Sequence, residues 1–449
     1  MCAWTPSCVN RKGGLWRLPI RRLRPCWPFL REACQAQCKL QRCCVGSVST
    51  SWQVQSPSIS GSGSDGQSQR DRLQRRFGRL RALMAKLRWP PVTHFVANGQ
   101  FHSLPIRSSQ PLPANPPKLS HEELAYFVGF FDGDGCVTVC SKRRYCILCV
   151  GQSYTRGEVL LRFQAAFGGG IYRHSLGKGL SKPSVQWMIT GEAAKRAAGI
   201  LSQWPSFKQS QLKIAADWPS CPLRCLDLWH DLKRMKQSEF KPESLACSWG
   251  YLAGFFDAEG YIFIRATSAS IVLNITQKNR AVLDCIHSFL QSEGLQSWTP
   301  AQQTGNGYFR TSCSTLATSR TTLQHMLLAG LLGKKSEAEL ALQMAPANFL
   351  DVRASLSLLS GNQSRYYRLQ PQGVKRAAHI KMLNHKLRPA RVSGQQTLEI
   401  SHDEKQLWQM REHHSMQCLA ERIDIVRLNI RSLLRQGASL IKRSRSMKD

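Results

Sequence analysis

One pattern occurs twice in this chain: YFVGFFDGDGCVTV begins at Tyr126, and YLAGFFDAEGYIFI begins at Tyr251. In both copies an apolar, helix-like run ends at acidic residues and passes directly into a strand-like segment. Each run contains a glycine, Gly129 or Gly254, although glycine costs a helix interior about 1 kcal/mol relative to alanine. Such a cost is reasonable where two backbones pack very closely. The pattern therefore predicts two helices that pack through their glycine faces and end in carboxylates.

The two copies belong to a long internal repeat. Each copy reads as helix, hairpin, helix, hairpin and further helices. Three chemically matched pairs share one register of 125 or 126 residues: Asp134 with Glu259, Gln152 with Gln277, and Lys208 with Lys334. The predicted fold is α/β (α+β), with two pseudo-symmetric αββαββα half-domains packed through the two motif helices. Each half is expected to contribute an antiparallel sheet to one saddle-shaped surface.

Shifts in composition divide the chain into five predicted parts. These are a targeting or disordered basic segment (1–65), a basic helix with a Pro-rich linker (66–117), the first repeat (118–235), the second repeat (236–350) and a basic helical C-terminal extension (351–449). The first repeat opens with a capping box, in which Ser120 is the N-cap and Glu123 is the third helical residue. The basic helix has apolar residues at helical spacing, so DNA, a membrane surface or a domain of the chain itself could cover that face.

The charge balance favours a polyanionic partner. The 449 residues include 62 Lys and Arg against 28 Asp and Glu, a net charge of +34, which favours nucleic acid first and an anionic membrane second. No run of about 18 apolar residues occurs, so no membrane span is expected. The 17 cysteines are crowded near the N-terminus or lie in apolar text, which indicates reduced thiols. Cys146 and Cys149 would point to opposite faces of a strand, which argues against a metal site there.

The N-terminal composition bears on localisation. The first 65 or so residues are rich in Arg and Ser and poor in acids, which suits an organellar transit peptide for a mitochondrion or chloroplast. A disordered basic tail explains the same composition equally well, and the nucleus is the alternative compartment.

The acids at the two helix ends suggest metal chemistry. Packing the two helices would bring Asp134 and Glu259 together, where like charge and two helix dipoles oppose their ionisation. A divalent cation would relieve that repulsion, and Mg²⁺ (or Mn²⁺) uses a few carboxylate oxygens while phosphate and water complete its shell. Two acids, a metal and a basic surface together describe metal-assisted phosphodiester hydrolysis.

The segments FVGFFDGDG (127–135) and LAGFFDAEG (252–260) resemble the two motifs of a single-chain LAGLIDADG homing endonuclease. The first copy departs from the family pattern at Phe127 and Val128, and the resemblance covers roughly residues 118–350. It implies that the last acid of each motif, Asp134 or Glu259, binds the catalytic metals. It assigns the earlier acid of each motif, Asp132 or Asp257, to hydrogen bonds that cap helix ends.

The resemblance implies further site residues. Gln152 and Gln277 match the family's polar residue at the end of the second strand, and Lys208 and Lys334 match its basic residue before the last helix. These residues are expected to organise water and the scissile phosphates, with Lys335 as a substitute for Lys334. A solvated helix start is the alternative explanation for the lysines.

The hairpins are the expected DNA readers, because a two-stranded ribbon fits the major groove. Counting in twos from each catalytic acid predicts the residues that face the bases. This face comprises Thr138, Cys140, Lys142 and Arg144 in the first copy, and Phe263, Arg265, Thr267 and Asn274 in the second, with Arg173 and Arg310 in the second hairpins.

The sequence therefore favours a site-specific double-strand DNA endonuclease that acts as a monomer on double-stranded DNA. Two alternatives stay open: an intron maturase that binds intron RNA, and a DNA-binding regulator without catalysis. A protein that only binds needs neither both acids, Asp134 and Glu259, nor both lysines. Because all four are present, the nuclease is preferred.

Overall fold

The computed structural model describes residues 64–107, 119–140, 145–236, 242, 244–360, 369–394 and 397–440. Almost all of the predicted targeting segment therefore lies outside the described residues. Within the described ranges no helix is both long and apolar enough to cross a membrane. All the cysteines in these ranges are free thiols, and Cys146 and Cys149 lie on opposite faces of one strand, as expected.

The first half-domain has the predicted order of elements. Its helices and strands are α3 (His121–Asp134), β4 (Gly135–Val139), β5 (Cys146–Ser153), α4 (Glu158–Phe167), β6 (Gly170–Ser175), β7 (Ser184–Thr190), α5 (Gly191–Leu201), α6 (Gln209–Ala216) and α7 (Pro222–Arg234). The predicted capping box is present, because Ser120 accepts from the Glu123 backbone and Glu123 bonds back to Ser120. The four strands form one antiparallel sheet in the order β4-β5-β7-β6.

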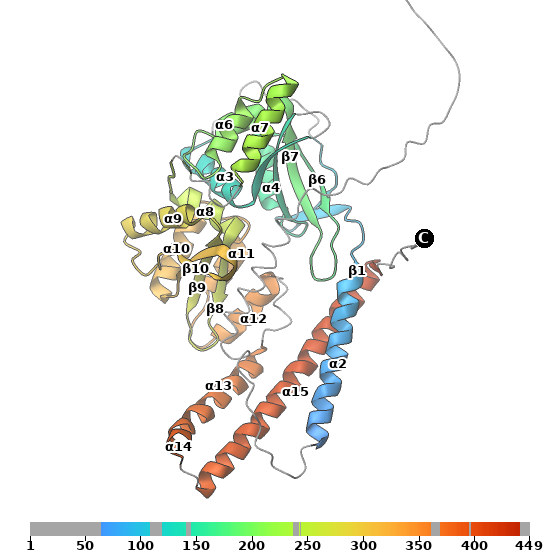
Figure 1. The fold of residues 1–449 in the computed structure, drawn as a ribbon, viewed down its shortest axis with the longest axis vertical. Coiled ribbons are helices and arrows are strands. Elements are labelled where there is room, and N and C mark those ends of the chain that lie inside the picture. The colour runs from blue at the N-terminus through green and yellow to red at the C-terminus, as the bar shows by residue number, and fades with distance from the viewer. Residues whose placement is uncertain are drawn as a thin grey trace, which may run out of the picture. The chain divides into compact units, whose positions relative to one another are not determined.

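The second half-domain repeats this plan (Figure 1). Its elements are α8 (Trp249–Glu259), β8 (Gly260–Ile264), β9 (Ile271–Gln277), α9 (Arg280–Ser292), β10 (Gln302–Thr304), β11 (Tyr308–Cys313), α10 (Leu316–Leu328) and α11 (Lys335–Leu342). Its strands form an antiparallel sheet in the order β10-β11-β9-β8. A mixed α/β fold with antiparallel sheets, as predicted, is therefore present in both repeats.

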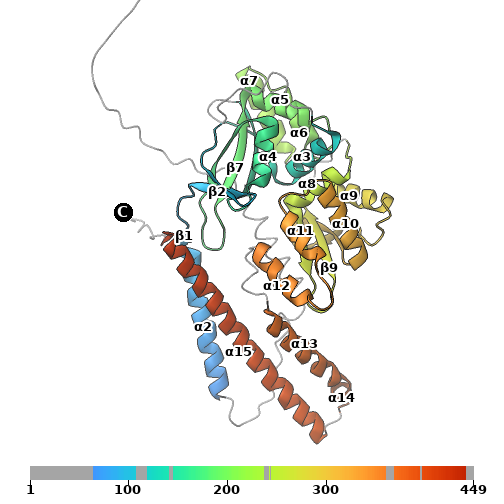
Figure 2. The ribbon, with the colours of Figure 1, turned by 180° about the vertical axis from the view of Figure 1, so that it is seen from behind.

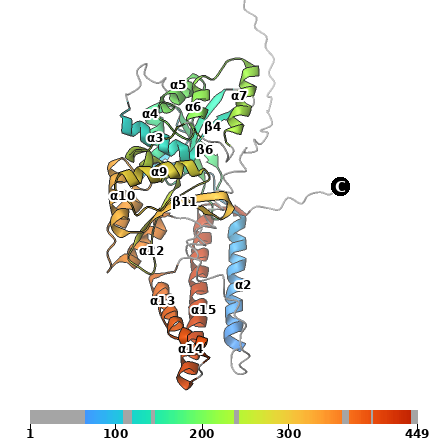
Figure 3. The same ribbon diagram turned by 60° about the vertical axis from the view of Figure 1, so that its left-hand side comes forward.

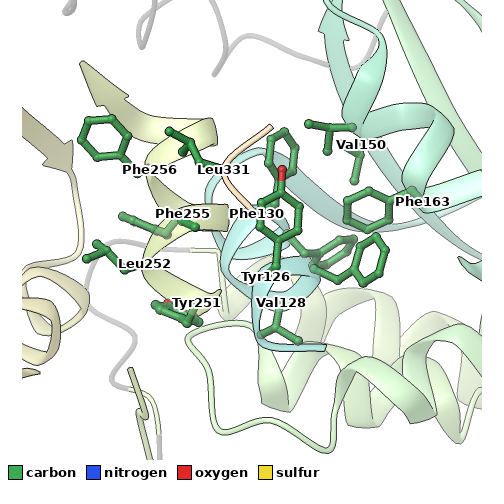
Figure 4. Packing of buried hydrophobic residues seen from close by; sticks show 14 of the residues in the cluster. Tyr126, Val128, Phe130, Val150, Phe163, Tyr251, Leu252, Phe255, Phe256 and Leu331 are labelled. Atoms are coloured by element: carbon green, nitrogen blue, oxygen red, sulfur yellow. The ribbon is translucent and has the colours of Figure 1, made fainter. Parts of the chain in front are cut away.

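The two motif helices, α3 and α8, pack against each other along a shared buried core (Figure 4). Each predicted glycine faces backbone on the opposite helix. A Cβ at Gly129 would lie 3.0 Å from the Phe255 nitrogen, and one at Gly254 would lie 2.8 Å from the Phe130 nitrogen. Glycine is therefore required here by the close approach of two backbones.

One part of the predicted Pro-rich linker is structured. Strands β2 (His94–Ala97) and β3 (Gln100–Ser103) form a hairpin whose turn contains Asn98 and Gly99, both at positive φ. Phe95 is fully buried in the core of the first half-domain. The interpretation of this segment as a linker was therefore wrong for the residues of β2 and β3. A two-residue Asn-Gly turn between partly apolar strands is typical of a β-hairpin.

The terminal regions form helices, as predicted for residues 66–117 in part and for 351–449. These are α2 (Ser64–Lys86), α12 (Phe349–Ser360), α13 (Pro371–Lys386), α14 (Arg388–Ser393) and α15 (Leu398–Arg435), with the short strands β1 (Leu87–Arg88) and β12 (Ser439–Leu440) pairing antiparallel. Helices α2 and α15 lie side by side (Figures 2 and 3). The apolar face of α2 therefore packs on another part of the chain, which was one of the three expected possibilities.

Candidate active site

Each motif helix ends at its second acid, and the next residue begins a strand. Gly135 and Gly260 cap the helices, with their N–H groups donating to Phe131 and Phe256 carbonyls four residues earlier. A side chain on Gly135 would collide with the Phe131 ring. The chain therefore turns sharply from helix to strand and leaves Asp134 at the surface end of the helix pair.

The first acid of each motif is a structural residue, as predicted. Asp132 is buried and accepts hydrogen bonds from the backbone N–H groups of Phe207 (2.9 Å) and Lys208 (3.0 Å), which precede α6. It also accepts from the hydroxyl of Tyr251, on the other motif helix, at 2.8 Å. Asp132 thus fixes the segment that carries Lys208 and ties it to the opposite half-domain.

Asp257 does the same in the second half-domain. It accepts from the backbone N–H groups of Leu332 (2.7 Å), Gly333 (2.9 Å) and Lys334 (2.7 Å), just before α11. The hydroxyl of Tyr126, on α3, donates to Asp257 at 2.7 Å. Burial raises the pKa of both Asp132 and Asp257, while the lysine that each positions opposes that shift.

Lys208 and Lys334 lie at the C-terminal ends of the two motif helices. The Lys208 ammonium donates to the carbonyls of Phe131 and Gly135, both at 2.7 Å. The Lys334 ammonium donates to the Phe256 carbonyl at 2.8 Å and to the Asp257 carbonyl. Burial lowers the pKa of both lysines. Each cation therefore offsets the negative end of a helix dipole beside the carboxylates.

The two glutamines reach the two outer acids. The Gln152 amide donates to Asp134 at 2.7 Å, and the Gln277 amide donates to Glu259 at 3.4 Å. Both acids keep partial solvent access, in contrast to Asp132 and Asp257. Burial among protein atoms raises the pKa of Asp134 to about 6 against the opposing charges of the two lysines. Burial, followed by the charge of Asp134, raises the pKa of Glu259 to about 7.

This arrangement fits a divalent cation. Asp134 and Glu259 repel each other, and in the described part of the chain one oxygen of each carboxylate accepts no hydrogen bond from protein. Two such oxygens from opposite half-domains are the hard ligands that Mg²⁺ or Mn²⁺ prefers. Among the described residues no group of three or more His, Cys, Asp and Glu side chains could hold a metal by itself. Any metal here would therefore depend on phosphate and water to complete its shell.

The sheet face opposite the core carries several of the predicted DNA-reading residues. Thr138 lies on β4 opposite Ile147, on the face away from Val137 and Leu148 of the core. In the second sheet, Arg310 pairs with Thr276, and Ser312 pairs with Asn274 on the same face. Asn274 itself is buried to 9% exposure. The aromatic rings of Tyr261 and Phe263 stack with centroids 5.7 Å apart on this open face.

Other predicted DNA-reading residues lie elsewhere. Arg173 pairs with Val185 and shares its strand face. Alternation therefore places Arg173 on the core side of the first sheet, although its side chain is exposed. Arg265 and Thr267 are exposed in the loop after β8, and Cys140 lies directly after β4. Lys142 and Arg144 lie outside the described residues. The open face of β6 carries Tyr172 and His174 instead of Arg173.

Comparison with known proteins agrees with the motifs. Residues 247–326 match the sequence model of the LAGLIDADG-like domain. Residues 247–326 therefore form a LAGLIDADG-like domain. It is similar to the meganuclease I-SmaMI bound to uncleaveable DNA, at 16% identity over 56% of this chain and 99% of that one, with a TM-score of 0.42. It is also similar to the LAGLIDADG meganuclease I-CpaMI bound to uncleaved DNA, at 13% identity over 52% and 98%, with a TM-score of 0.39. No curated protein matches.

The match of residues 247–326 to this family model confirms the predicted family resemblance.

The hydroxyl bridges between the two motif helices were missed by the sequence analysis. Tyr126 and Tyr251 each donate to the structural acid of the opposite helix, so the two bridges are reciprocal. A signal for them was available, because the two tyrosines are 125 residues apart, in the same register as Asp134 and Glu259. Glu122 was missed as well, although it accepts from the Gly250 N–H at 2.7 Å and so caps the opposite LAGLIDADG helix.

Proposed function

We propose that this chain is a divalent-metal-dependent endonuclease that cuts both strands of duplex DNA at a specific site. The observation that supports the proposal best is the arrangement at the ends of α3 and α8. There, one chain holds Asp134 and Glu259 on paired helices, each with a glutamine and a lysine in the same relative position. Because both half-sites come from a single chain, the protein would act as a monomer.

Different residues of the chain would bind the metal, orient the carboxylates and bind the duplex. Asp134 and Glu259 would hold Mg²⁺ or Mn²⁺ through the oxygens that carry no protein hydrogen bond. When bound, the metal polarises the phosphodiester and lowers the pKa of the attacking water. Gln152 and Gln277 orient the carboxylates, and their amides can also hold water near the scissile phosphates. The open faces of the two sheets would bind the duplex on either side of this centre.

The two lysines would favour the ionised form of the acids. The charges of Lys208 and Lys334 lower the pKa of both Asp134 and Glu259 against the opposing effect of burial. Release of a proton when metal binds at neutral pH would therefore cost less free energy than it would without the lysines. In the free protein both ammonium groups bond to helix-end carbonyls, so their contact with a scissile phosphate would require those bonds to exchange.

Cleavage of a mixed DNA population tests the proposal without knowledge of the target. Purified protein would be incubated with a plasmid library carrying random inserts, with Mg²⁺ or with a chelator, and the linear products would be sequenced across their ends. We expect Mg²⁺-dependent linearisation at one recurring sequence. Asp134→Asn and Glu259→Gln should abolish it and leave DNA binding largely intact.

The matched control is Asp284→Asn, which removes a partly exposed carboxylate of α9. Within the described part of the chain, its ion pair is with Arg280 on the same helix. It should cut at the wild-type rate. Double-strand cutting at near wild-type rate by either active-site variant would contradict the assignment of the acids.

We also propose a mitochondrial or chloroplast location, which fusion of residues 1–65 to a fluorescent protein would test.

A further inference from the structure

Helix α2 carries arginines on the face that it does not use for packing. Its packing face has apolar residues spaced alternately by four and three, and Leu87 of β1 continues the series: Leu73, Phe77, Leu80, Met84 and Leu87. The facing residues of α15 have the same spacing: Leu419, Ile423, Val426, Ile430 and Leu433. This spacing is that of a coiled-coil seam. The seam leaves the rest of the α2 surface open.

Six exposed basic residues lie along that open surface and at its end. We call them the arginine stripe: Arg72, Arg75, Arg76, Arg79, Lys86 and Arg88. Within the described part of the chain none of the six forms an ion pair, whereas the neighbouring Arg70 pairs with Glu412 of α15. Asp71 is the acidic neighbour of the stripe and is exposed. The stripe is therefore an exposed concentration of positive charge.

Helix stability does not explain this stripe. Arg72 and Arg76, like Arg75 and Arg79, are four residues apart, and like charges at this spacing destabilise a helix by about 0.2–0.5 kcal/mol per pair. Packing against α15 requires only the apolar seam. The charges are thus unfavourable for the isolated helix, and a polyanion on the stripe would reverse their effect.

The stripe is joined to the outer part of the first sheet. Trp89 follows β1, and its backbone N–H and indole N–H donate to the carbonyls of Gly177 and Gly179, at 3.0 and 2.9 Å. Both glycines belong to the loop between β6 and β7, the two strands farthest from β4 in the sheet. In that loop, Lys178 is exposed and pairs through its backbone with Arg88. Basic side chains therefore continue from the sheet edge onto α2.

We propose that the arginine stripe binds the phosphate backbone of duplex DNA next to the segment that the two sheets hold. This inference rests on the proposed function, because it takes the sheets as the main DNA-binding surface. From Arg72 to Lys86 a helix rises about 21 Å, at 1.5 Å per residue. One DNA strand presents about six phosphates over that distance, at 3.4 Å per phosphate. Duplex DNA is chosen over other polyanions because the stripe is continuous with the sheet edge.

A neutralised stripe provides the test. The variant Arg72→Gln, Arg75→Gln, Arg76→Gln and Arg79→Gln would be compared with wild type for binding to random-sequence duplexes of increasing length, at several salt concentrations. The control variant removes four exposed basic residues from α13, α14 and α15: Lys375→Gln, Lys381→Gln, Arg388→Gln and Lys405→Gln. Both variants lose four positive charges, so the comparison tests whether the place of the lost charge matters.

We expect the stripe variant to bind short duplexes like wild type and long duplexes more weakly. The slope of log K against log salt should fall by about 0.9 for each phosphate that the variant no longer neutralises, but only for the long duplexes. The control variant should keep the wild-type slope at every length. An equal loss in both variants, or an equal slope for stripe variant and wild type on long duplexes, would overturn the inference.

Two further outcomes identify what has failed. If wild type binds no duplex of any length, the proposed function fails, and the inference fails with it. Suppose instead that wild type binds short DNA duplexes and that the stripe variant loses affinity only for double-stranded RNA of matched length. The sheets would then still bind DNA, but the proposal that the stripe binds DNA would be wrong. Equal melting temperatures of the three proteins would show that the substitutions leave the fold intact.

Discussion

Gly254→Ala should separate the two motif helices and damage stability and catalysis together. A Cβ at this position would lie 2.8 Å from the Phe130 nitrogen and 2.9 Å from the Tyr126 carbonyl carbon, and still closer to the Tyr126 oxygen. These are backbone atoms of a buried helix, so no side chain can rotate away to make room. The helices must therefore move apart, and the packed residues around them must follow.

Two effects of opposite sign decide the size of the change. Alanine favours a helix over glycine by about 1 kcal/mol. Overpacking a core costs typically 1–3 kcal/mol, and a rigid backbone obstacle places this site at the upper end. The net destabilisation is then about 1–2 kcal/mol, which corresponds to a fall in Tm of about 2–8 °C for a unit of this size. Cleavage should fall further, because a 1 Å displacement of catalytic groups can cost about 100-fold.

Thermal unfolding and the plasmid cleavage assay measure the two effects separately. Gly199→Ala is the matched control, because Gly199 also lies within a helix, α5, but a Cβ there meets only the Ala216 methyl at 3.9 Å. The control should keep full cleavage and the same or a slightly higher Tm. If Gly254→Ala were as stable and as active as Gly199→Ala, the argument from close backbone approach would be refuted.

Three other predictions follow from the site. The folded protein binds the Glu259 proton more tightly than the unfolded chain, so with a chelator present wild-type stability should fall as the pH rises from about 4.5 to 7. The Tm of Glu259→Gln should then exceed that of wild type by an increasing amount across this range. A Tm difference that does not change with pH, or the same result for exposed Glu339→Gln, would contradict the raised pKa. Tyr251→Phe removes a hydrogen bond to buried Asp132 and should lower the free energy of unfolding in urea by about 1.5–3 kcal/mol, whereas partly exposed Tyr261→Phe should change it little. Lys334→Met should move the rising limb of the pH–cleavage profile to higher pH, since the lysine charge lowers the pKa of both Asp134 and Glu259. An unchanged midpoint, or the same shift in Lys335→Met, would contradict this role of Lys334.

Much of the half-domain could be predicted because its signals are local or repeated. The Ser120 capping box, the helix ending at Asp134 and the hairpins all depend on residues close together in the chain. The repeat also predicts which distant residues lie in equivalent places, since residues at the same register occupy equivalent positions in two similar halves. In this way the sequence alone predicts the pairs Asp134 with Glu259 and Gln152 with Gln277.

It was harder to predict which face of a sheet each side chain lies on. Successive side chains of a strand point to opposite faces, and the face of the first one depends on the packing of the whole sheet. Counting from Asp134 placed Thr138 on the open face, but Arg173, in a later hairpin with no acid to count from, lies on the core side. The β2–β3 hairpin was hidden for a related reason: a Pro-rich segment looks like a linker until Phe95 is seen to pack in the core of the first half-domain.

The sequence by itself determined which residues repeat, which helices end in acids, and that two glycines must meet another backbone. Only the tertiary structure decided which groups bond across the helix pair. Tyr126 reaches Asp257 rather than the nearer-in-sequence Asp132, and Lys208 and Lys334 reach helix-end carbonyls rather than solvent. The physical reason is that a buried hydroxyl, carboxylate or ammonium must find a partner in three dimensions, and that partner depends on how two helices approach, which neither helix encodes alone.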